Sequence, residues 1–202
     1  MTRSGGQETR VRILRTAAEL FRRQGYGATG LNQILSASGA PKGSLYFHFP
    51  GGKEQLAAEA TALAGRDLGE RMAAAVAAAD GPRAAVTALG DVLADGLAAS
   101  GYRDGCPVAT VALEQAGEAG PIQDACAATY EGWLAGLREQ LKSWGAPEDT
   151  AAELADLALS SVQGALLLAQ VRRDVGVLHT IAGQVGAHIE ARLATVTTGG
   201  AA

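Results

Sequence analysis

Hydroxyl, cationic and imidazole side chains are concentrated between positions 29 and 53 of the sequence. They are Thr29, Lys42, Ser44, Tyr46, His48 and Lys53. Side chains of these kinds, together with backbone amides at helix N-termini, are the groups that bind phosphates and the edges of bases. The segment therefore predicts contact with a nucleic acid.

Two short helices joined by a turn are expected to position these groups. Leu31, Ile34 and Leu35 are spaced three and four apart, which predicts one buried face on the first helix. Gly39 lies where the chain needs a left-handed turn, and Pro41 suits the first turn of the next helix.

The second short helix is expected to be held by three apolar anchors, Leu45, Phe47 and Phe49. The polar residues between them would then face outward. This arrangement predicts a helix-turn-helix, whose second helix enters the major groove of DNA.

The run from Thr9 to Leu56 resembles the DNA-binding domain of the TetR/AcrR family of bacterial regulators. The residues that carry the resemblance are Ala17-Ala18-Glu19-Leu20-Phe21, Gly25-Tyr26, Thr29, Ile34, Gly39, Lys42-Gly43-Ser44-Leu45-Tyr46, His48-Phe49 and Lys53-Glu54. The sequence HFPGGKEQL and the later run Gly105-Cys106-Pro107-Val108-Ala109-Thr110 look like the LmrA/YxaF-like branch. The chain departs from the commoner family pattern at Ala40-Pro41, before the second short helix, and at Gly51-Gly52, before Lys53.

Contacts to DNA are assigned residue by residue. Thr29 is expected to be the N-cap of the first short helix, so that its hydroxyl and the neighbouring amides face a phosphate. Lys42 and Ser44 would reach base edges or flanking phosphates. Gly43 either lets the backbone approach the DNA or serves helix packing.

Three further contacts complete the predicted surface. The resemblance implies that the Tyr46 phenol donates to a phosphate. His48 either hydrogen-bonds a phosphate or braces the helix end. Lys53, which opens the next helix, is the expected clamp on the DNA backbone.

Charge is divided unevenly along the 202 residues. The whole chain carries a net charge of −4, but residues 1–60 hold eight Lys or Arg against four Glu, whereas residues 61–202 carry −8. A basic N-terminal part, here called the head (residues 1–60), and an acidic remainder, called the body (residues 61–202), are the expected layout when one end of a protein binds phosphates.

The fold class is predicted to be all-α. The chain is 48% hydrophobic, rich in Ala and poor in strand patterns, and Gly and Pro divide it into about nine helices. We expect a three-helix helix-turn-helix DNA-binding domain at residues 1–52 and a larger ligand-sensing and dimerisation domain at residues 53–202.

The sequence also predicts a cytoplasmic protein. The N-terminus lacks the apolar segment of a signal peptide. The most apolar run, Leu157–Ala169, is shorter than the ~20 residues that a membrane span needs. Cys106 and Cys126 suit a reducing cytosol as two buried thiols.

Two apolar stripes near the C-terminus predict subunit pairing. They consist of Leu154, Leu157, Ser161, Ala165 and Leu168, and of Leu178, Ile181, Val185, Ile189, Leu193 and Val196. Stripes of this kind also form intramolecular cores, but the resemblance implies a homodimer built on these two helices, with two heads that read a palindrome.

The resemblance further implies a ligand cavity among the middle helices. Its candidate lining residues are Cys106, Tyr130, Trp133 and Gln163, although the two aromatic side chains could equally be core. Because the body has few aromatics and no charge cluster, a small, largely apolar effector is expected, with no cofactor and no metal. We expect a repressor that this effector releases from a palindromic operator.

Other classes of function were weighed against this interpretation. An enzyme is disfavoured, because the sequence lacks a phosphate-binding loop, a nucleophile elbow and a metal-binding motif. His179 and His188 are nine residues apart, on nearly opposite helix faces, so they cannot share a metal. The alternatives that remain are a ligand-independent DNA-binding protein and a regulator that senses redox state through Cys106 and Cys126.

Overall fold

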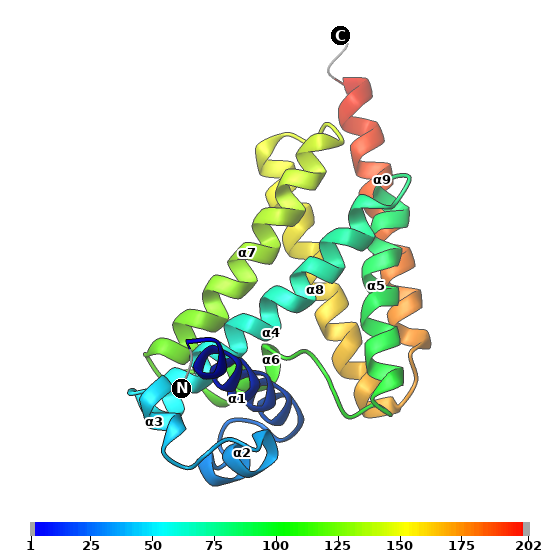
Figure 1. Cartoon of the computed structure of the whole chain (residues 1–202). Helices are drawn as coiled ribbons and strands as arrows, with labels where there is room; N and C mark the ends of the chain where they lie inside the picture. Colours follow the sequence, from blue (N-terminus) through cyan, green and yellow to red (C-terminus); the bar gives the residue numbers. More distant parts are fainter. Residues whose placement is uncertain (1–2, 200–202) are drawn as a thin grey trace. The chain divides into compact units, whose positions relative to one another are not determined.

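The computed structural model describes residues 3–199, with side chains described from Gly5 to Thr195, and these residues form nine α-helices and no strand (Figure 1). The helices are α1 (Arg3–Gln24), α2 (Leu31–Ser38), α3 (Ser44–His48), α4 (Gly52–Ala77), α5 (Pro82–Ala99), α6 (Ala109–Glu114), α7 (Pro121–Ser143), α8 (Glu148–Arg172) and α9 (Gly176–Gly199). The predicted all-α class and the expected number of helices are confirmed for this part of the chain.

The helix boundaries differ from the expected ones mainly in α1 and α6. Helix α1 begins at Arg3, although the sequence pattern predicted a start near Glu8. The added turn has no apolar residue to reveal its period and contains two glycines, so the pattern carried no signal there. Helix α6 covers Ala109–Glu114 and is shorter than the predicted span from Pro107 to about Ala116.

The chain forms two compact units that do not follow sequence order. Unit 1 consists of the residues up to Asp67 together with Cys106–Thr129, and unit 2 of Leu68–Gly105 with the residues from Tyr130 onward. Helices α4 and α7 therefore contribute residues to both units. The predicted domain boundary between residues 52 and 53 stays a proposal.

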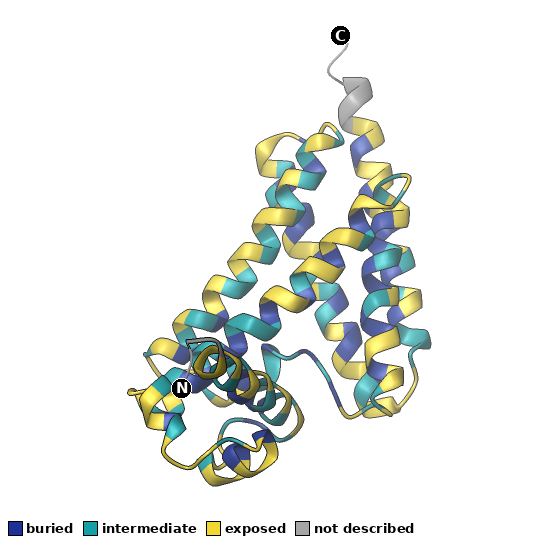
Figure 2. Ribbon diagram, in the orientation of Figure 1, coloured by how far each residue is buried: buried dark blue, intermediate teal, exposed yellow. Residues whose placement is uncertain are grey.

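The core of unit 1 is built where the first three helices meet the start of α4. Its fully buried side chains include Ile13, Phe21, Ile34, Leu45, Phe49 and Leu56 (Figure 2). Gly39 ends α2 in a left-handed conformation with φ of 62°, and its N–H donates to the carbonyls at the end of that helix. Gly39 therefore has the predicted left-handed conformation. The prediction that Pro41 opens the next helix is wrong, because α3 begins at Ser44 and Pro41 lies in the turn before it, where its carbonyl accepts the Ser44 N–H.

Two polar contacts tie distant segments of unit 1 together. The Arg10 guanidinium pairs with the carboxylate of Glu59 and lies over the Phe49 ring, 5.0 Å from its centroid. The Glu114 carboxylate accepts the Gly27 N–H at 2.7 Å. Gly25, with φ of 81°, leaves room for that carboxylate, because a Cβ there would lie 1.6 Å from Glu114 Oε1.

Unit 2 is centred on α5, which packs mainly against α9 and also against α8. Leu89, Leu93 and Leu97 form the buried side of α5. Gly90 allows α9 to approach closely, because a Cβ at this position would lie 2.6 Å from the Cβ of Ala182.

Helices α4 and α7 also pack closely, and again at glycines. In unit 1, a Cβ on Gly65 would lie 2.4 Å from Thr129 Cγ2, and in unit 2 a Cβ on Gly69 would lie 2.8 Å from the Nε1 of Trp133. The two long helices can approach to this distance only because both positions lack a side chain.

The two predicted apolar stripes are divided between core and surface. On α8, Leu154 and Ala165 are buried, whereas Leu157 and Leu168 are exposed. Of the stripe on α9, Leu178, Ile189 and Leu193 are buried within the chain. Ile181 and Val185 are half-buried, and the Val196 side chain lies outside the described residues.

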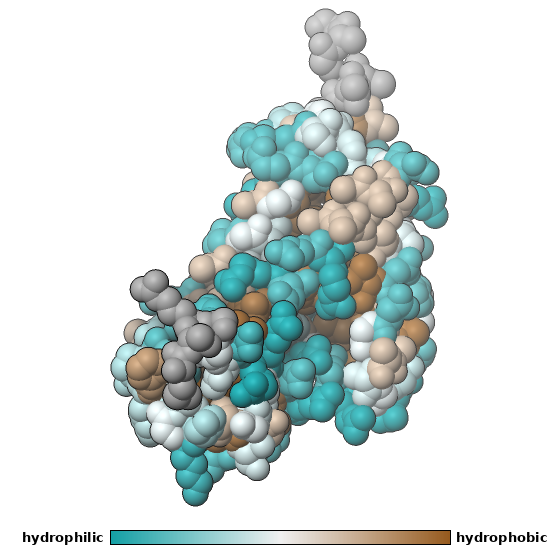
Figure 3. All heavy atoms as spheres, viewed as in Figure 1, coloured by the Kyte–Doolittle hydropathy of each residue, from teal (hydrophilic) through white to brown (hydrophobic). Residues whose placement is uncertain are grey.

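Helix α8 is also the one helix of the described residues that is long and apolar enough to cross a membrane by length and composition. Core helices of soluble proteins meet the same two criteria, and α8 packs against α5 and α9. Hydrophilic residues cover much of the surface seen in Figure 3, with apolar residues emerging between them.

Two glycines of α5 should respond in opposite ways to alanine. Gly90→Ala is expected to lower the free energy of unfolding by about 1–2 kcal/mol, because overpacking against Ala182 outweighs the gain in helix propensity. Gly96→Ala is the matched control, since a Cβ there meets nothing within 4 Å; it should raise stability by up to about 1 kcal/mol. Urea denaturation at equal protein concentration measures both, and a change of the same sign in both variants would contradict the close approach of α5 and α9.

Candidate nucleic-acid surface and ligand cavity

Helix α3 exposes one side and buries the other. Leu45 and Phe49 are fully buried, as predicted, whereas Phe47 is 81% exposed and Tyr46 63%. The expectation that Phe47 anchors the helix is therefore wrong. At ~100° per residue, positions 45 and 49 share a face and position 47 lies on the opposite one.

Thr29 does not have the predicted position at the helix end. The N-cap of α2 is Gly30, without a side-chain cap. Thr29 is fully buried, and its hydroxyl donates to the Gly25 carbonyl at 2.6 Å and accepts from Gln24 Nε2 at 3.1 Å. The capping prediction is wrong because this hydroxyl closes the turn instead. A phosphate contact near Thr29 stays a prediction, and the amides of the first turn of α2 are the groups left to make it.

The predicted residues at the start of α3 lie together at the surface. Lys42 and Gly43 are exposed. The Ser44 hydroxyl donates to the Pro41 carbonyl at 2.6 Å. A Cβ on Gly43 would meet nothing within 4 Å, so no close packing within the chain requires glycine there. This open space counts against the packing role of Gly43, and the approach of DNA to its backbone stays a prediction.

Rings connect the buried and exposed sides of α3. The His48 ring packs edge-on against Phe47, with centroids 5.0 Å apart, and against Phe49, with centroids 6.4 Å apart. These contacts favour the bracing role that was one of the two expectations for His48. The other, a hydrogen bond to a phosphate, stays a prediction.

Lys53 is held by an aromatic ring at the start of α4. Its Nζ lies 4.2 Å from the centroid of Tyr26, a distance typical of a cation–π contact. Burial raises the pKa of the Tyr26 phenol, and the negative charge of Glu54 raises this pKa further. Tyr26 therefore stays neutral at physiological pH, with the Lys53 ammonium over its face.

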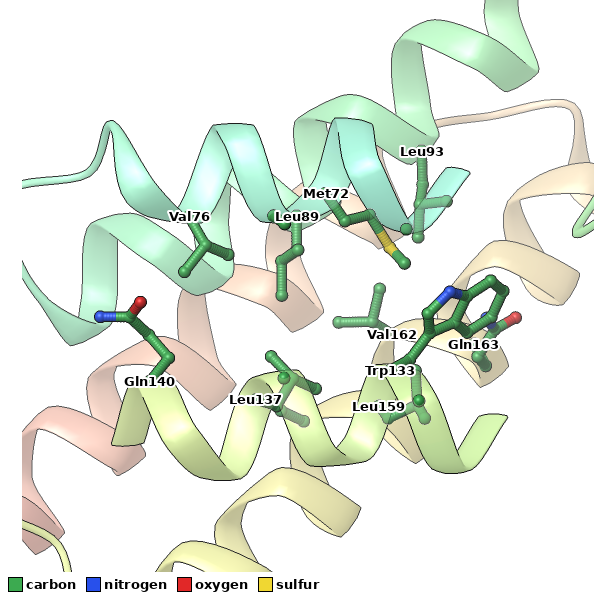
Figure 4. A pocket seen from close by; sticks show the side chains of 15 residues that line it. Met72, Val76, Leu89, Leu93, Trp133, Leu137, Gln140, Leu159, Val162 and Gln163 are labelled. Atoms are coloured by element: carbon green, nitrogen blue, oxygen red, sulfur yellow. The ribbon is translucent and has the colours of Figure 1, made fainter. Parts of the chain in front are cut away.

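Unit 2 contains a cavity of about 170 Å³ between α4, α5, α7 and α8 (Figure 4). Its apolar lining consists mainly of Met72, Val76, Leu89, Leu93, Trp133, Leu137, Leu159 and Val162. For comparison, an engineered apolar cavity of ~150 Å³ binds benzene. The cavity in this conformation therefore suits a molecule built around a single ring.

Two glutamines supply polar side chains to the cavity wall, and they differ in their partners. The Nε2 of Gln140 donates to Ser143 Oγ at 3.0 Å. The Nε2 of Gln163 is buried and has no hydrogen-bond partner among the described residues. None of the lining residues is charged. The cavity therefore combines an apolar wall with one unpaired hydrogen-bond donor, a combination that fits a neutral molecule carrying an acceptor.

Two of the four predicted lining residues belong to this wall. Trp133 and Gln163 line the cavity. Tyr130 instead packs edge-on against Trp133, with ring centroids 5.3 Å apart, and Cys106 belongs to unit 1. The contributions of α4 and α5 were missed. Met72 and Val76 are spaced i, i+4 on α4, a spacing that an ordinary buried helix face shows as well.

The two cysteines lack the surroundings of a reactive pair. Both are buried free thiols. Burial raises the pKa of the Cys126 thiol, and the neighbouring Cys106 raises this pKa further. A raised pKa lowers the fraction of reactive thiolate. Within the described residues, no group of three or more His, Cys, Asp or Glu is arranged to hold a metal ion.

Comparison with known proteins places both parts of the chain. Residues 13–60 match the model of bacterial regulatory proteins of the tetR family, and residues 82–184 match that of the C-terminal domain of LmrA/YxaF-like transcriptional regulators. The HTH-type transcriptional regulator LmrA of Bacillus subtilis is 37% identical over 83% of this chain and 89% of its own length. An uncharacterized HTH-type regulator of Mycobacterium tuberculosis is 39% identical over 84% and 88%.

Solved structures give the same result. A TetR transcriptional regulator from Chloroflexus aurantiacus superposes with a TM-score of 0.79 at 28% identity, covering 93% of this chain and 96% of its own. The chain, with its helix-turn-helix in unit 1 and its match to the LmrA/YxaF-like C-terminal domain, therefore belongs to the TetR family of DNA-binding transcriptional regulators, which are not enzymes.

Proposed function

We propose that the protein is a cytoplasmic, homodimeric repressor that a small, neutral, largely apolar molecule releases from a palindromic operator. The observation that carries this proposal is the cavity of unit 2, with its apolar wall and the unpaired donor of Gln163. An unpaired buried donor costs about 1–3 kcal/mol. A ligand with an acceptor in reach of Gln163 would remove that cost.

The exposed side of α8 supports the homodimer. Leu157, Leu168 and Val171 are exposed at positions i, i+11 and i+14, which share one helix face. Gly164 lies between them, and a Cβ there would meet nothing within 4 Å, so another helix can approach closely at this point. A second copy of α8 is the expected partner. In such a dimer, two recognition helices can read half-sites one DNA turn, ~34–36 Å, apart.

Two helices that contribute residues to both units support a coupling between the binding of a ligand and the binding of DNA. Helix α4 begins at Gly52, just after α3, and its residues Met72 and Val76 line the cavity. Helix α7 likewise contributes to unit 1 and lines the cavity with Trp133. A ligand that favours one arrangement of these helices shifts DNA affinity by the ratio of its affinities for the two states.

Contacts to DNA can be tested with Tyr46→Phe, Lys42→Ala and Lys53→Ala. Loss of one phosphate hydrogen bond in Tyr46→Phe should weaken binding about three- to tenfold on every sequence. Each lysine variant should reduce the slope of log K against log salt by about one, and Lys42→Ala should also relax base preference. Fluorescence anisotropy with upstream DNA and a scrambled duplex measures both effects.

A cation outside the proposed surface provides the control. Lys142 of α7 lies in unit 2, where it pairs with Glu139 at 2.8 Å and Glu148 at 2.9 Å. Lys142→Ala should leave DNA binding unchanged. Unchanged affinity in all three test variants as well would rule out this surface as the DNA contact.

The effector cavity can be tested with two probes of similar shape, acetophenone and ethylbenzene. Because only acetophenone carries an acceptor, it should bind the wild type about three- to tenfold more tightly, as expected for one neutral hydrogen bond. Gln163→Leu should remove this preference. Gln140→Leu is the matched control, since the Gln140 amide is already bonded to Ser143.

Calorimetry gives the affinities of the two probes, and anisotropy with bound operator shows whether acetophenone releases it. Equal binding of the two probes by the wild type would contradict the role of Gln163. Failure of both to bind at millimolar concentration would contradict an apolar effector in this cavity.

A further inference from the structure

We propose that Phe47 reads the methyl group of a thymine in each half of the operator. The inference rests on the assignment of α3 as the element that enters the major groove. Phe47 is the most exposed large apolar side chain of the described residues, at 81%, and Figure 3 shows apolar surface in the region where Figure 1 draws α3.

The ring of Phe47 is the last of a row of packed rings. The Arg10 guanidinium lies over Phe49, the His48 ring packs edge-on against Phe49, and Phe47 packs edge-on against His48. Phe49 is fully buried. This row of rings extends from the core of unit 1 to its surface and ends in the phenyl group of Phe47.

The chemistry of a phenyl group limits what it can recognise in DNA. It neither donates nor accepts a conventional hydrogen bond, so it gains little from phosphates or from the polar edges of bases. The apolar group that unmodified DNA presents in the major groove is the C5-methyl of thymine. Contact with that methyl removes apolar surface of both partners from water.

The residues around Phe47 favour DNA over a protein partner. Helix α3 contains no acidic residue, and Lys42 and Lys53 flank it in the sequence. Tyr46, next to Phe47, is also exposed. An exposed ring among cations and hydroxyls suits a polyanion with one apolar contact, whereas a protein interface would need a broader apolar patch.

The test replaces thymine with deoxyuridine, one position at a time, in an operator selected from a random duplex library. Deoxyuridine lacks only the C5-methyl. Wild-type protein should lose about fourfold in affinity at one position of each half-site, the ratio that corresponds to burial of one methyl group. Replacement in both half-sites should cost about 15-fold.

Phe47→Ala should bind the thymine and deoxyuridine operators equally, with the affinity that the wild type has for deoxyuridine or lower. Phe47→Leu, which stays apolar, should keep part of the discrimination. Leu113→Ala is the matched control, since Leu113 is 73% exposed on α6 of the same unit; it should discriminate as the wild type does. Circular dichroism checks that each variant is folded.

The possible results separate the two proposals. Full affinity of the wild type for every deoxyuridine duplex, or full discrimination by Phe47→Ala, would overturn the role of Phe47 while leaving operator binding intact. An unchanged operator affinity in Phe47→Ala combined with weaker self-association would assign the ring to a protein contact and overturn it as well. Failure to select any operator would instead count against the proposed operator binding itself.

Discussion

The close approach of α4 and α7 is a constraint that acts in both units. It is possible because Gly65 and Gly69 have no side chain where Thr129 and Trp133 lie against α4. A larger residue at either position would separate the helices or displace Trp133. Since α4 and α7 contribute both to unit 1 and to the cavity wall, the two glycines maintain helix packing in each unit: Gly65 in unit 1 and Gly69 beside Trp133 of the cavity wall.

Unit 1 uses some side chains of its helix-turn-helix internally and leaves others exposed. The hydroxyls of Thr29 and Ser44 donate to backbone carbonyls, and these bonds close the turns that position α2 and α3. Lys42, Tyr46 and Phe47 have no comparable role in the fold and remain at the surface. The first 60 residues carry a net positive charge and the rest of the chain a net negative one. This contrast favours approach of a polyanion to the N-terminal part, because the acidic remainder repels it.

The fold was largely predictable, because helix periods, glycine stops and proline starts are local signals. The exposed side of α3 was not predicted correctly. The aromatic residue at position 47 was expected to be buried, although it lies two positions after Leu45 and therefore on the opposite face of the helix. The cavity was found only in part. Trp133 and Gln163 stood out as unusual residue types, whereas Met72, Val76, Leu89 and Leu93 look like ordinary core in sequence. Whether a leucine faces a packed neighbour or a void depends on the tertiary arrangement of four helices.

The contact between Glu114 and Gly27 has a consequence for how the chain becomes a folded protein during synthesis. Unit 1 is discontinuous in sequence, because its first 67 residues pack with Cys106–Thr129. The ribosome therefore synthesises the whole helix-turn-helix long before it reaches Glu114. The carboxylate of Glu114 accepts the N–H of Gly27, which lies in the turn between α1 and α2. Domains at an N-terminus commonly fold first during translation. In this protein an incomplete chain that ends before α6 lacks both the acceptor for the Gly27 N–H and the helix that packs against α1.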